Sequence, residues 1–290
     1  MRIREIIFPV DFSSSNAAAC PYVAAVAKCL DAKLILLHVV EDQPPCSTPL
    51  DRLHTDAERE MEDRKTAARD SLEAFRSQYI PQPNAETHVL CGDPATVITL
   101  FAGDGDSRVI MMPTHGYGPF RRMLLGSVTA KVLHDARCPV WTSPHMDVAI
   151  NTAEWFALRR ILCAVPLNWE SDRLLSRSAA LATHLGAELT AFHVLAPLEE
   201  GLLEMADAEG RQLSPEPARR KLEEAASRVP GVSKTYVRVG EVSREVARAA
   251  REHNADLIVI GRGGTPEMWG RLGSHAYAIV RRAPCPVLCI

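Results

Sequence analysis

Short apolar segments and longer amphipathic segments alternate along the chain, with the same rhythm in each half. The apolar segments predict strands at 3–10, 34–40, 86–90, 109–112 and 139–142, and again at 161–165, 189–195, 235–239, 257–260 and 286–290. Segments with helical spacing predict helices at 14–30, 56–79, 171–185 and 218–228, and helices that begin at positions 94, 127, 242 and 274. Strands that alternate with helices in this way are typical of right-handed βαβ units, and therefore of a parallel sheet covered on both faces.

The two halves are an internal repeat. Five pairs of segments match in the same order: REIIFPV with RRILCAV, AKLILLHVV with AELTAFHVL, VLCGDPATVI with VRVGEVSREV, VIMMPTHG with LIVIGRGG, and LLGSVTAKVLHDARCPVW with RLGSHAYAIVRRAPCPVL. Their offsets shorten along the chain from 155 residues to 148 and 147, as short deletions would produce. The sequence therefore predicts two tandem five-stranded parallel-sheet α/β domains, at 1–143 and 159–290, joined by a linker at 144–158.

Composition excludes several classes of protein. The 290 residues are enough for two domains, and 47% hydrophobic with 24% charged residues is the balance of a globular chain. A net charge of −3 indicates no basic field for nucleic acid or anionic membrane, and no apolar run is long enough to span a bilayer. Pro9 and Asp11 interrupt the N-terminal apolar stretch, so we expect no signal peptide. Eight cysteines without a CxxC pair fit neither a disulfide framework nor a zinc site, and they predict a cytoplasmic location.

Two segments of the first half are candidates for a ligand site, because open parallel sheets bind ligands beyond the carboxyl ends of their strands, where the strand order reverses. The loop after the fourth strand favours an anion. Its Gly116 permits close backbone approach, and Arg121 and Arg122 add positive charge. Gly126-Ser127 then opens a helix, whose free N–H groups and dipole suit a phosphate.

The second segment follows the first strand and contains Asp11. Its short carboxylate suits a ribose hydroxyl or a magnesium ion, and the backbone of Val39, at the end of the second strand, suits an adenine edge. Structural alternatives stand beside these. Asp11 is also a favoured helix cap, and Gly126-Ser127 and Gly273-Ser274 are also ordinary helix starts. His38 and His193, which match across the repeat, are interpreted as hydrogen-bonded strand-end histidines and the mixed-charge helix at 56–79 as a solvated surface.

These motifs resemble those of the universal stress protein family, in a tandem two-domain form. In its ATP-binding branch the loop reads Gly, two residues, Gly, nine residues, Gly, then Ser or Thr; here Gly116 and Gly126-Ser127 match, and Pro113 stands at the first glycine. The resemblance implies an adenine nucleotide alpha hydrolase-like, Rossmann-like fold and an ATP site. That site would place adenine near Val39 and ribose near Asp11 and Gly126. The remaining implied contacts are phosphates near His115, Gly116, Ser127 and Val128, and a wall of Pro9, Met112 and Pro113.

The second half departs from the pattern in another way. Gly261 and Gly264 match, but only eight residues separate Gly264 from Gly273-Ser274; nine separate Gly263 from it, so the loop is either one residue short or shifted in register. Pro166 replaces Asp11, and the amide of Asn168 is a neutral substitute two residues later. We therefore expect one good site in the first half and a weaker one, at Gly261, Gly264, Gly273 and Ser274, in the second.

The leading functional hypothesis is a stress-response regulator that binds ATP, with or without Mg²⁺, and lacks dedicated catalysis. Its basis is a phosphate seat without a P-loop lysine, paired acids or a water-activating residue. A slow ATPase or phosphotransferase is one alternative, and a tandem scaffold that works without nucleotide is another. The apolar last strands, 139–142 and 286–290, predict a homodimer or an intramolecular pseudo-dimer through sheet edges.

Overall fold

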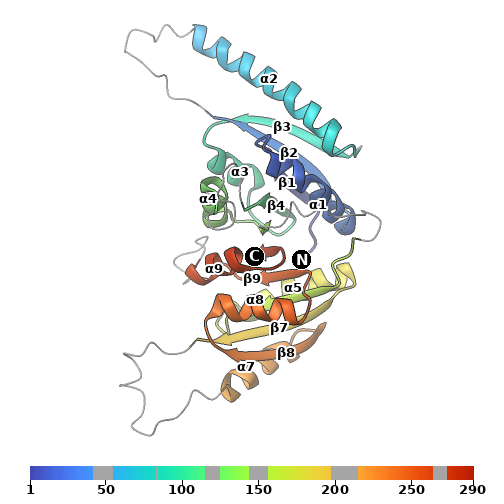
Figure 1. The fold of residues 1–290 in the computed structure, drawn as a ribbon, viewed down its shortest axis with the longest axis vertical. Coiled ribbons are helices and arrows are strands. Elements are labelled where there is room, and N and C mark those ends of the chain that lie inside the picture. Colours follow the sequence, from blue (N-terminus) through green and yellow to red (C-terminus); the bar gives the residue numbers. More distant parts are fainter. Residues whose placement is uncertain (42–54, 83, 115–124, 144–155, 197–214, 264–272) are drawn as a thin grey trace, which may run out of the picture. The chain divides into compact units, whose positions relative to one another are not determined.

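The computed structural model describes residues 1–41, 55–82, 84–114, 125–143, 156–196, 215–263 and 273–290 (Figure 1). The chain forms two compact α/β units, one built chiefly from Ile3–Trp141 and the other chiefly from Ala157–Ile290. We refer to them as the first and the second domain. Among the described residues, no helix has the length and apolar character needed to cross a bilayer.

The first domain alternates strands and helices (Figure 1). In chain order its elements are β1 (Glu5–Pro9), α1 (Ser14–Leu30), β2 (Lys33–Val40), α2 (Thr55–Tyr79), β3 (Ala85–Cys91), α3 (Pro94–Ala102), β4 (Arg108–Pro113), α4 (Ser127–Asp135) and β5 (Val140–Ser143). The strand order is β3-β2-β1-β4-β5, and β1 pairs in parallel with both β2 and β4. The order reverses at β1, so the crevice between the carboxyl ends of β1 and β4 is the switch point.

Because the strand order reverses at β1, the helices lie on both faces of the sheet. Right-handed crossovers that run in opposite directions along a sheet lie on opposite faces. Accordingly, α1 and α2 contact each other on one side, while α3 and α4 pack together on the other. Both faces of the central strands are thus covered, which explains why Ile6, Ile7 and Phe8 are fully buried.

The second domain repeats this arrangement. Its elements are β6 (Arg160–Ala164), α5 (Ser171–Leu185), β7 (Glu188–Leu195), α7 (Glu216–Ser227), β8 (Val232–Val239), α8 (Val242–Glu252), β9 (Leu257–Ile260), α9 (Ser274–Arg282) and β10 (Val287–Cys289). The strand order is β10-β9-β6-β7-β8, with parallel pairs. Ile161 pairs with Leu257 as Ile6 pairs with Val109, so the offsets of 155 and 148 residues hold in the sheet register.

The α/β class and the parallel pairing predicted from the sequence are confirmed, and the element bounds differ by a few residues. The largest shift at the start of a strand is in β8, which begins at Val232 although the pattern predicts 235. Among the described strands β8 pairs with β7 alone, and it contains exposed and half-buried residues without a regular alternation, so its first residues, Val-Ser-Lys, give no periodic signal. A register irregularity between Leu189 and Thr190 accompanies this start.

Side chains from distant parts of the first domain close its core. Trp141 is fully buried and donates its indole N–H to the Tyr22 hydroxyl at 3.2 Å. The ring of Phe156, from the predicted linker, meets Tyr22 edge-on with centroids 5.5 Å apart. The described cysteines are all free, in line with the absence of a CxxC pair.

Candidate functional site

A cavity of about 630 Å³ lies at the carboxyl edge of the first domain's sheet. Its size is within the range of small-molecule sites, roughly 300–1,000 Å³. Its walls come from the ends of β1, β2 and β4, from the starts of α1, α3 and α4, and from one residue of α2. The lining residues are Pro9, Val10, Asp11, Asn16, Leu37, His38, Val39, Val40, Glu41, Arg64, Pro94, Ile98, Met112, Pro113, Gly126, Ser127, Val128 and Thr129.

The turn after β1 has a defined backbone. Phe12 adopts φ of 59°, which reverses the chain, and its ring lies against His38 with centroids 4.6 Å apart. His38 donates from Nδ1 to the carbonyl oxygen of Val10 at 2.7 Å, because that carbonyl only accepts. The histidine therefore ties the end of β2 to the turn, as expected for a strand-end histidine.

Asp11 occupies the middle of this turn, and its side chain is exposed. Its Oδ1 accepts from the Ser13 N–H at 2.9 Å, and its own N–H donates to Asn16 Oδ1 at 2.7 Å. The helix cap is Ser13, whose Oγ accepts from the Asn16 N–H at 3.1 Å. The alternative that Asp11 caps α1 is therefore wrong. These contacts hold the Asp11 carboxylate at the cavity wall.

The start of α4 presents backbone donors to the same cavity. Gly126 is the N-cap residue and provides no side-chain oxygen, and the first helical hydrogen bond is from Ala130 N–H to Gly126 O. The N–H groups of Ser127, Val128 and Thr129 precede that bond, so they have no helical acceptor. Together with the helix dipole, they make this wall suitable for an anion.

Two contacts set the position of α4. Gly126 N–H donates to Thr114 O at 2.9 Å, and Thr129 Oγ1 donates to Pro113 O at 3.2 Å. Both tie the first turn of the helix to the end of β4. The anion-binding wall is thus anchored to the sheet at the switch point rather than carried by the loop alone.

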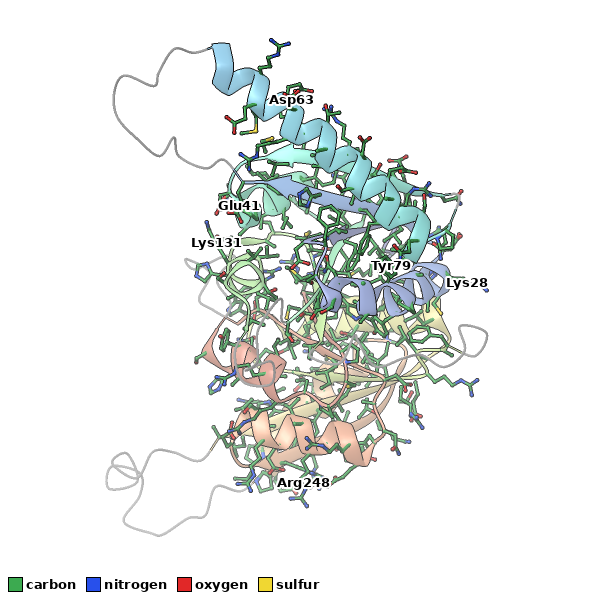
Figure 2. The ribbon with its side chains drawn as sticks, turned by 45° about the horizontal axis from the view of Figure 1, so that its top comes forward. Lys28, Glu41, Asp63, Tyr79, Lys131 and Arg248 are labelled. Carbon is green, nitrogen blue, oxygen red and sulfur yellow. The ribbon has the colours of Figure 1, made fainter. Side chains whose placement is uncertain are left out.

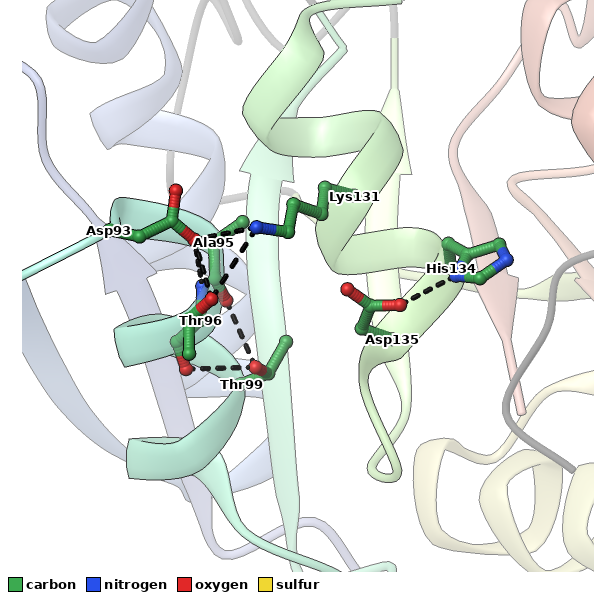
Figure 3. A network of polar contacts seen from close by, with 7 residues as sticks. All are labelled: Asp93, Ala95, Thr96, Thr99, Lys131, His134 and Asp135. Atoms are coloured by element: carbon green, nitrogen blue, oxygen red, sulfur yellow. Dashed lines mark hydrogen bonds and ion pairs between the residues drawn. The ribbon is translucent and has the colours of Figure 1, made fainter.

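A polar network joins α4 to α3 (Figure 3). Lys131 Nζ donates to Asp93 Oδ1 at 2.8 Å, and Asp93 caps α3 by accepting from the Thr96 N–H. The hydrogen bond from Lys131, followed by those from Thr96, lowers the pKa of Asp93 to about 2. Lys131 thus forms an ion pair with the cap of α3, the helix from which Pro94 and Ile98 line the cavity.

Sequence reasoning missed Arg64, which lines the cavity from α2. Its Nη2 donates to the carbonyl oxygen of Glu41, at the end of β2, at 3.1 Å. Glu41 and Lys131 lie toward the same end of the first domain, whereas Lys28 and Tyr79 lie toward the other (Figure 2). Nothing in the mixed-charge pattern of α2 distinguishes Arg64 from its neighbours, because only the packing of the helix brings this position to the cavity.

The predicted site residues are placed as follows. Eight of them line the cavity: Pro9, Asp11, Val39, Met112, Pro113, Gly126, Ser127 and Val128. Gly261 directly follows β9, and Gly273 and Ser274 begin α9, so these three lie at the corresponding edge of the second domain. The predictions for His115, Gly116 and Gly264 lie outside the described residues.

The second domain has two hydrogen bonds that match those around the cavity of the first domain. His193 donates from Nδ1 to Val165 O at 2.7 Å, and Gly273 N–H donates to Arg262 O at 2.7 Å, as Gly126 N–H does to Thr114 O. Burial lowers the pKa of His193, against a smaller opposing effect of its hydrogen bond. Gly273 follows Arg262 by eleven positions and Gly126 follows Thr114 by twelve, so the second loop is one residue shorter.

The turn after β6 differs in chemistry. Pro166 has no N–H to donate, and Ser171, at the position of Asn16, donates its hydroxyl to Asn168 O at 2.8 Å. The Asn168 side-chain oxygen accepts from the Glu170 N–H at 2.9 Å. The amide that the sequence offered as a substitute for Asp11 is therefore engaged within its own turn.

Comparison with known proteins identifies relatives of the whole chain. The sequence matches the family described as "Universal stress protein family" over residues 2–144 and 157–290. A universal stress protein of Mycolicibacterium smegmatis is 24% identical and covers 98% of this chain and 96% of its own. One of Methanocaldococcus jannaschii is 27% identical over 47% of this chain and 79% of its own. The crystal structure of a universal stress protein from Archaeoglobus fulgidus, at 22% identity, has a TM-score of 0.70 and covers 100% of this chain and 98% of its own.

Proposed function

Because this chain belongs to the universal stress protein family, we propose that its first domain binds an adenine nucleotide, ATP, in the cavity at the carboxyl edge of the sheet. The protein then acts as a stress-response regulator without dedicated catalysis. The observation that carries this proposal is that Asp11 and the uncapped start of α4 line one cavity of about 630 Å³. A carboxylate suits the hydroxyls of a sugar, and a helix N-terminus suits phosphate.

The backbone of Val39 supports the assignment of a base to the end of β2. Alternate residues of a parallel strand bond to opposite neighbours. Leu37 O accepts from the N–H of Val10, which directly follows β1, whereas Val40 O accepts from the N–H of Gly92, which directly follows β3. Val39 is in phase with Leu37, and the pairing of β1 with β2 ends at Pro9 and Leu37. The N–H and C=O of Val39 therefore face the side where β1 has ended, as pairing with an adenine edge requires.

The predicted Mg²⁺ fits only as a companion of the phosphates. Among the described residues no group of three or more His, Cys, Asp or Glu side chains forms a metal site. Asp11 is one carboxylate at the cavity, and Mg²⁺ in nucleotide sites commonly takes one or two carboxylates, with phosphate and water as its other ligands. When bound with ATP, the ion supplies charge neutralisation for the phosphates.

Pro113 modifies this site rather than removing it. Its ring stands where the ATP-binding loop pattern has glycine, and it contributes no N–H donor. Its carbonyl oxygen is used by Thr129, so the residue also holds α4 in place. Affinity for ATP is therefore expected to be lower than with glycine at this position.

Isothermal titration of the full chain with ATP and MgCl₂ tests the proposal, with Pro113→Gly as a second sample. We expect binding in both and tighter binding in Pro113→Gly. Failure of both proteins to bind at millimolar ATP would refute it. Phosphate release above background that disappears in Asp11→Asn would replace the regulator by a slow ATPase or phosphotransferase.

Sedimentation with and without ATP tests the proposed association of the family fold through its last strands, β5 and β10. A regulator is expected to change its sedimentation or its shape with nucleotide. Assembly that is identical in both conditions would favour the scaffold alternative.

A further inference from the structure

We propose that the Glu170 carboxylate excludes anionic ligands from the crevice of the second domain, so that each chain holds one nucleotide, in the first domain. The inference rests on the proposed function of the first domain. It names the residue that makes the two crevices different, and this residue is not part of the loop pattern from which a weaker second site was predicted.

Glu170 lies at the start of α5 and reaches the carboxyl edge of the sheet. Its Oε2 is buried and has no hydrogen-bond partner among the described residues. This oxygen lies 3.4 Å from the position that a Cβ on Gly261 would occupy, and Gly261 directly follows β9. The carboxylate therefore lies between the beginning of α5 and the end of β9, at the switch point of the second sheet.

The corresponding place in the first domain belongs to the cavity. The sheet register relates Gly261 to Pro113, which lines that cavity, through the offset of 148 residues. The offset of 155 that relates the ends of α1 and α5 pairs Glu170 with Ser15. The second domain thus has glycine at the position of Pro113 and glutamate at the position of Ser15, and only in the second domain are these two positions shown to be in contact range.

The glycine at 261 and the glutamate at 170 fit each other in space. A Cβ at position 261 would lie 3.4 Å from Glu170 Oε2, in van der Waals contact, so a larger residue there would bring its side chain against the carboxylate. Glycine at 261 leaves room for the buried oxygen. The neutral residues Pro113 and Ser15 of the first domain are thus replaced, in the second, by a pair that includes the acidic Glu170. In the first domain the matching wall faces the α4 helix start that suits an anion.

The position of Glu170 determines how its charge acts on an anion in the crevice. Burial raises the pKa of Glu170, and the charge of Arg173 on the same helix lowers it by a smaller amount. In its ionised form this carboxylate repels a phosphate, and the repulsion is only partly screened because Oε2 is buried and accepts no hydrogen bond from a described residue. Pro166 removes the ribose carboxylate from the same crevice, so loss of one ligand group and gain of a repelling group coincide.

Titration calorimetry of the full chain with ATP and MgCl₂ tests the inference, together with photo-cross-linking by azido-ATP and peptide mapping. For the wild type we expect one equivalent of ATP, cross-linked to the first domain. Glu170→Gln retains the shape and removes the charge. It is expected to bind a second equivalent, cross-linked to the second domain, with an affinity at least tenfold weaker than that of the first site.

Asp172→Asn is the matched control. It removes one negative charge from the same helical turn, where Asp172 Oδ1 accepts from Arg228 Nη2 at 2.8 Å on the surface. We expect this variant to remain at one equivalent. A second equivalent in Asp172→Asn would overturn the inference, because net charge rather than Glu170 would then be responsible.

The outcomes separate this inference from the proposed function. Two equivalents in the wild type, or one in Glu170→Gln, would overturn the role of Glu170 and leave ATP binding by the first domain intact. A second equivalent in Glu170→Ala but not in Glu170→Gln would also overturn it, because volume and not charge would close the crevice. A wild type that binds nothing, with a Glu170→Gln variant that binds in the second domain, would refute the proposed function and support Glu170. No binding by either protein would refute both.

Discussion

The turns that follow β1 and β6 begin with the same backbone conformation and differ in chemistry and in where the next helix starts, at Ser14 and at Ser171. Phe12 and Leu167, at matching positions, both have positive φ, 59° and 54°. The histidine-to-carbonyl bond is 2.7 Å in each domain. This frame reverses the chain after the strand and requires nothing of the residue between, which is Asp11 in one turn and Pro166 in the other. The duplicated fold therefore keeps the start of each turn while its chemistry changes.

The differences between the two turns are nevertheless coordinated. Asp11 N–H needs a buried acceptor, and Asn16 Oδ1 provides it at 2.7 Å. Pro166 has no N–H, and the residue that matches Asn16 is Ser171, which bonds within its own turn. The residue at the cavity and the residue behind it on the helix thus differ together, so neither turn has an Asp11-type N–H without its Asn16-type acceptor.

Gly126→Val is expected to cause the largest loss of ATP affinity and so to separate the two domains most clearly. A branched side chain at the start of α4 enters the cavity and displaces a phosphate from the N–H groups of Ser127 and Val128, so we expect more than about a 100-fold loss of ATP affinity, or about 2.8 kcal/mol. Gly273→Val is the matched change in the second domain and is expected to alter affinity less than about 3-fold. Calorimetry measures both, and circular dichroism checks that each variant folds. The opposite order of effects would contradict the assignment of the site to the first domain.

Asp11→Ala is expected to weaken ATP binding by about 10- to 100-fold, because a charged hydrogen bond contributes about 1.5–3 kcal/mol. The fold should persist, since the cap of α1 is Ser13 and the Asp11 N–H remains. Asn168→Ala, in the second domain, serves as the control and should leave affinity unchanged. Equal affinity of Asp11→Ala and wild type in the same titration would remove the ribose assignment.

Arg64→Ala is expected to reduce ATP affinity by about 3-fold, because Arg64 is a half-buried cation that lines the cavity and its charge is screened by solvent. Arg69→Ala provides a control on the same helix, where Arg69 pairs with Glu62 at 3.2 Å on the surface. If Arg69→Ala weakens binding as much as Arg64→Ala, the effect belongs to the net charge of α2 and not to the cavity. The salt dependence of affinity should fall in Arg64→Ala.

The smallest expected effect is a pH dependence of the stability of the second domain, which we attribute to His193. Burial lowers its pKa in the folded state, so its contribution to stability is present above the unfolded pKa of about 6.5 and is lost as the pH falls through the folded value. Hydrogen exchange of the second domain should therefore speed up as the pH falls below about 6.5, after correction for intrinsic rates. His193→Gln, which keeps a donor for Val165 O, should flatten this dependence. An unchanged profile in that variant would assign the effect to another group.

Local signals account for the part of the fold that was predicted well. The bounds of α1, Ser14–Leu30, agree with the prediction because a serine cap precedes the helix and Asp31, in the left-handed region, ends it. β9 agrees as well, because an entirely buried strand is entirely apolar. Edge strand β8 lacks that pattern, and its start was missed. The wall formed by Asn16, Ile98 and Arg64 was also missed, because no local pattern indicates which face of a helix meets a cavity.

The sequence by itself determined the doubled α/β architecture, the family and the set of residues to examine, because periodicity, caps and repeats are local or additive along the chain. Only the tertiary structure decided which of them meet. It brings Asp11, Val39 and the start of α4 around one cavity, adds Arg64 from a helix that the charge pattern assigned to the surface, and places the buried Oε2 of Glu170 near Gly261. These contacts join residues that are far apart along the chain, and their energies depend on how deeply each group is buried and on which other groups lie nearby. Burial and neighbours are set only when the chain is packed.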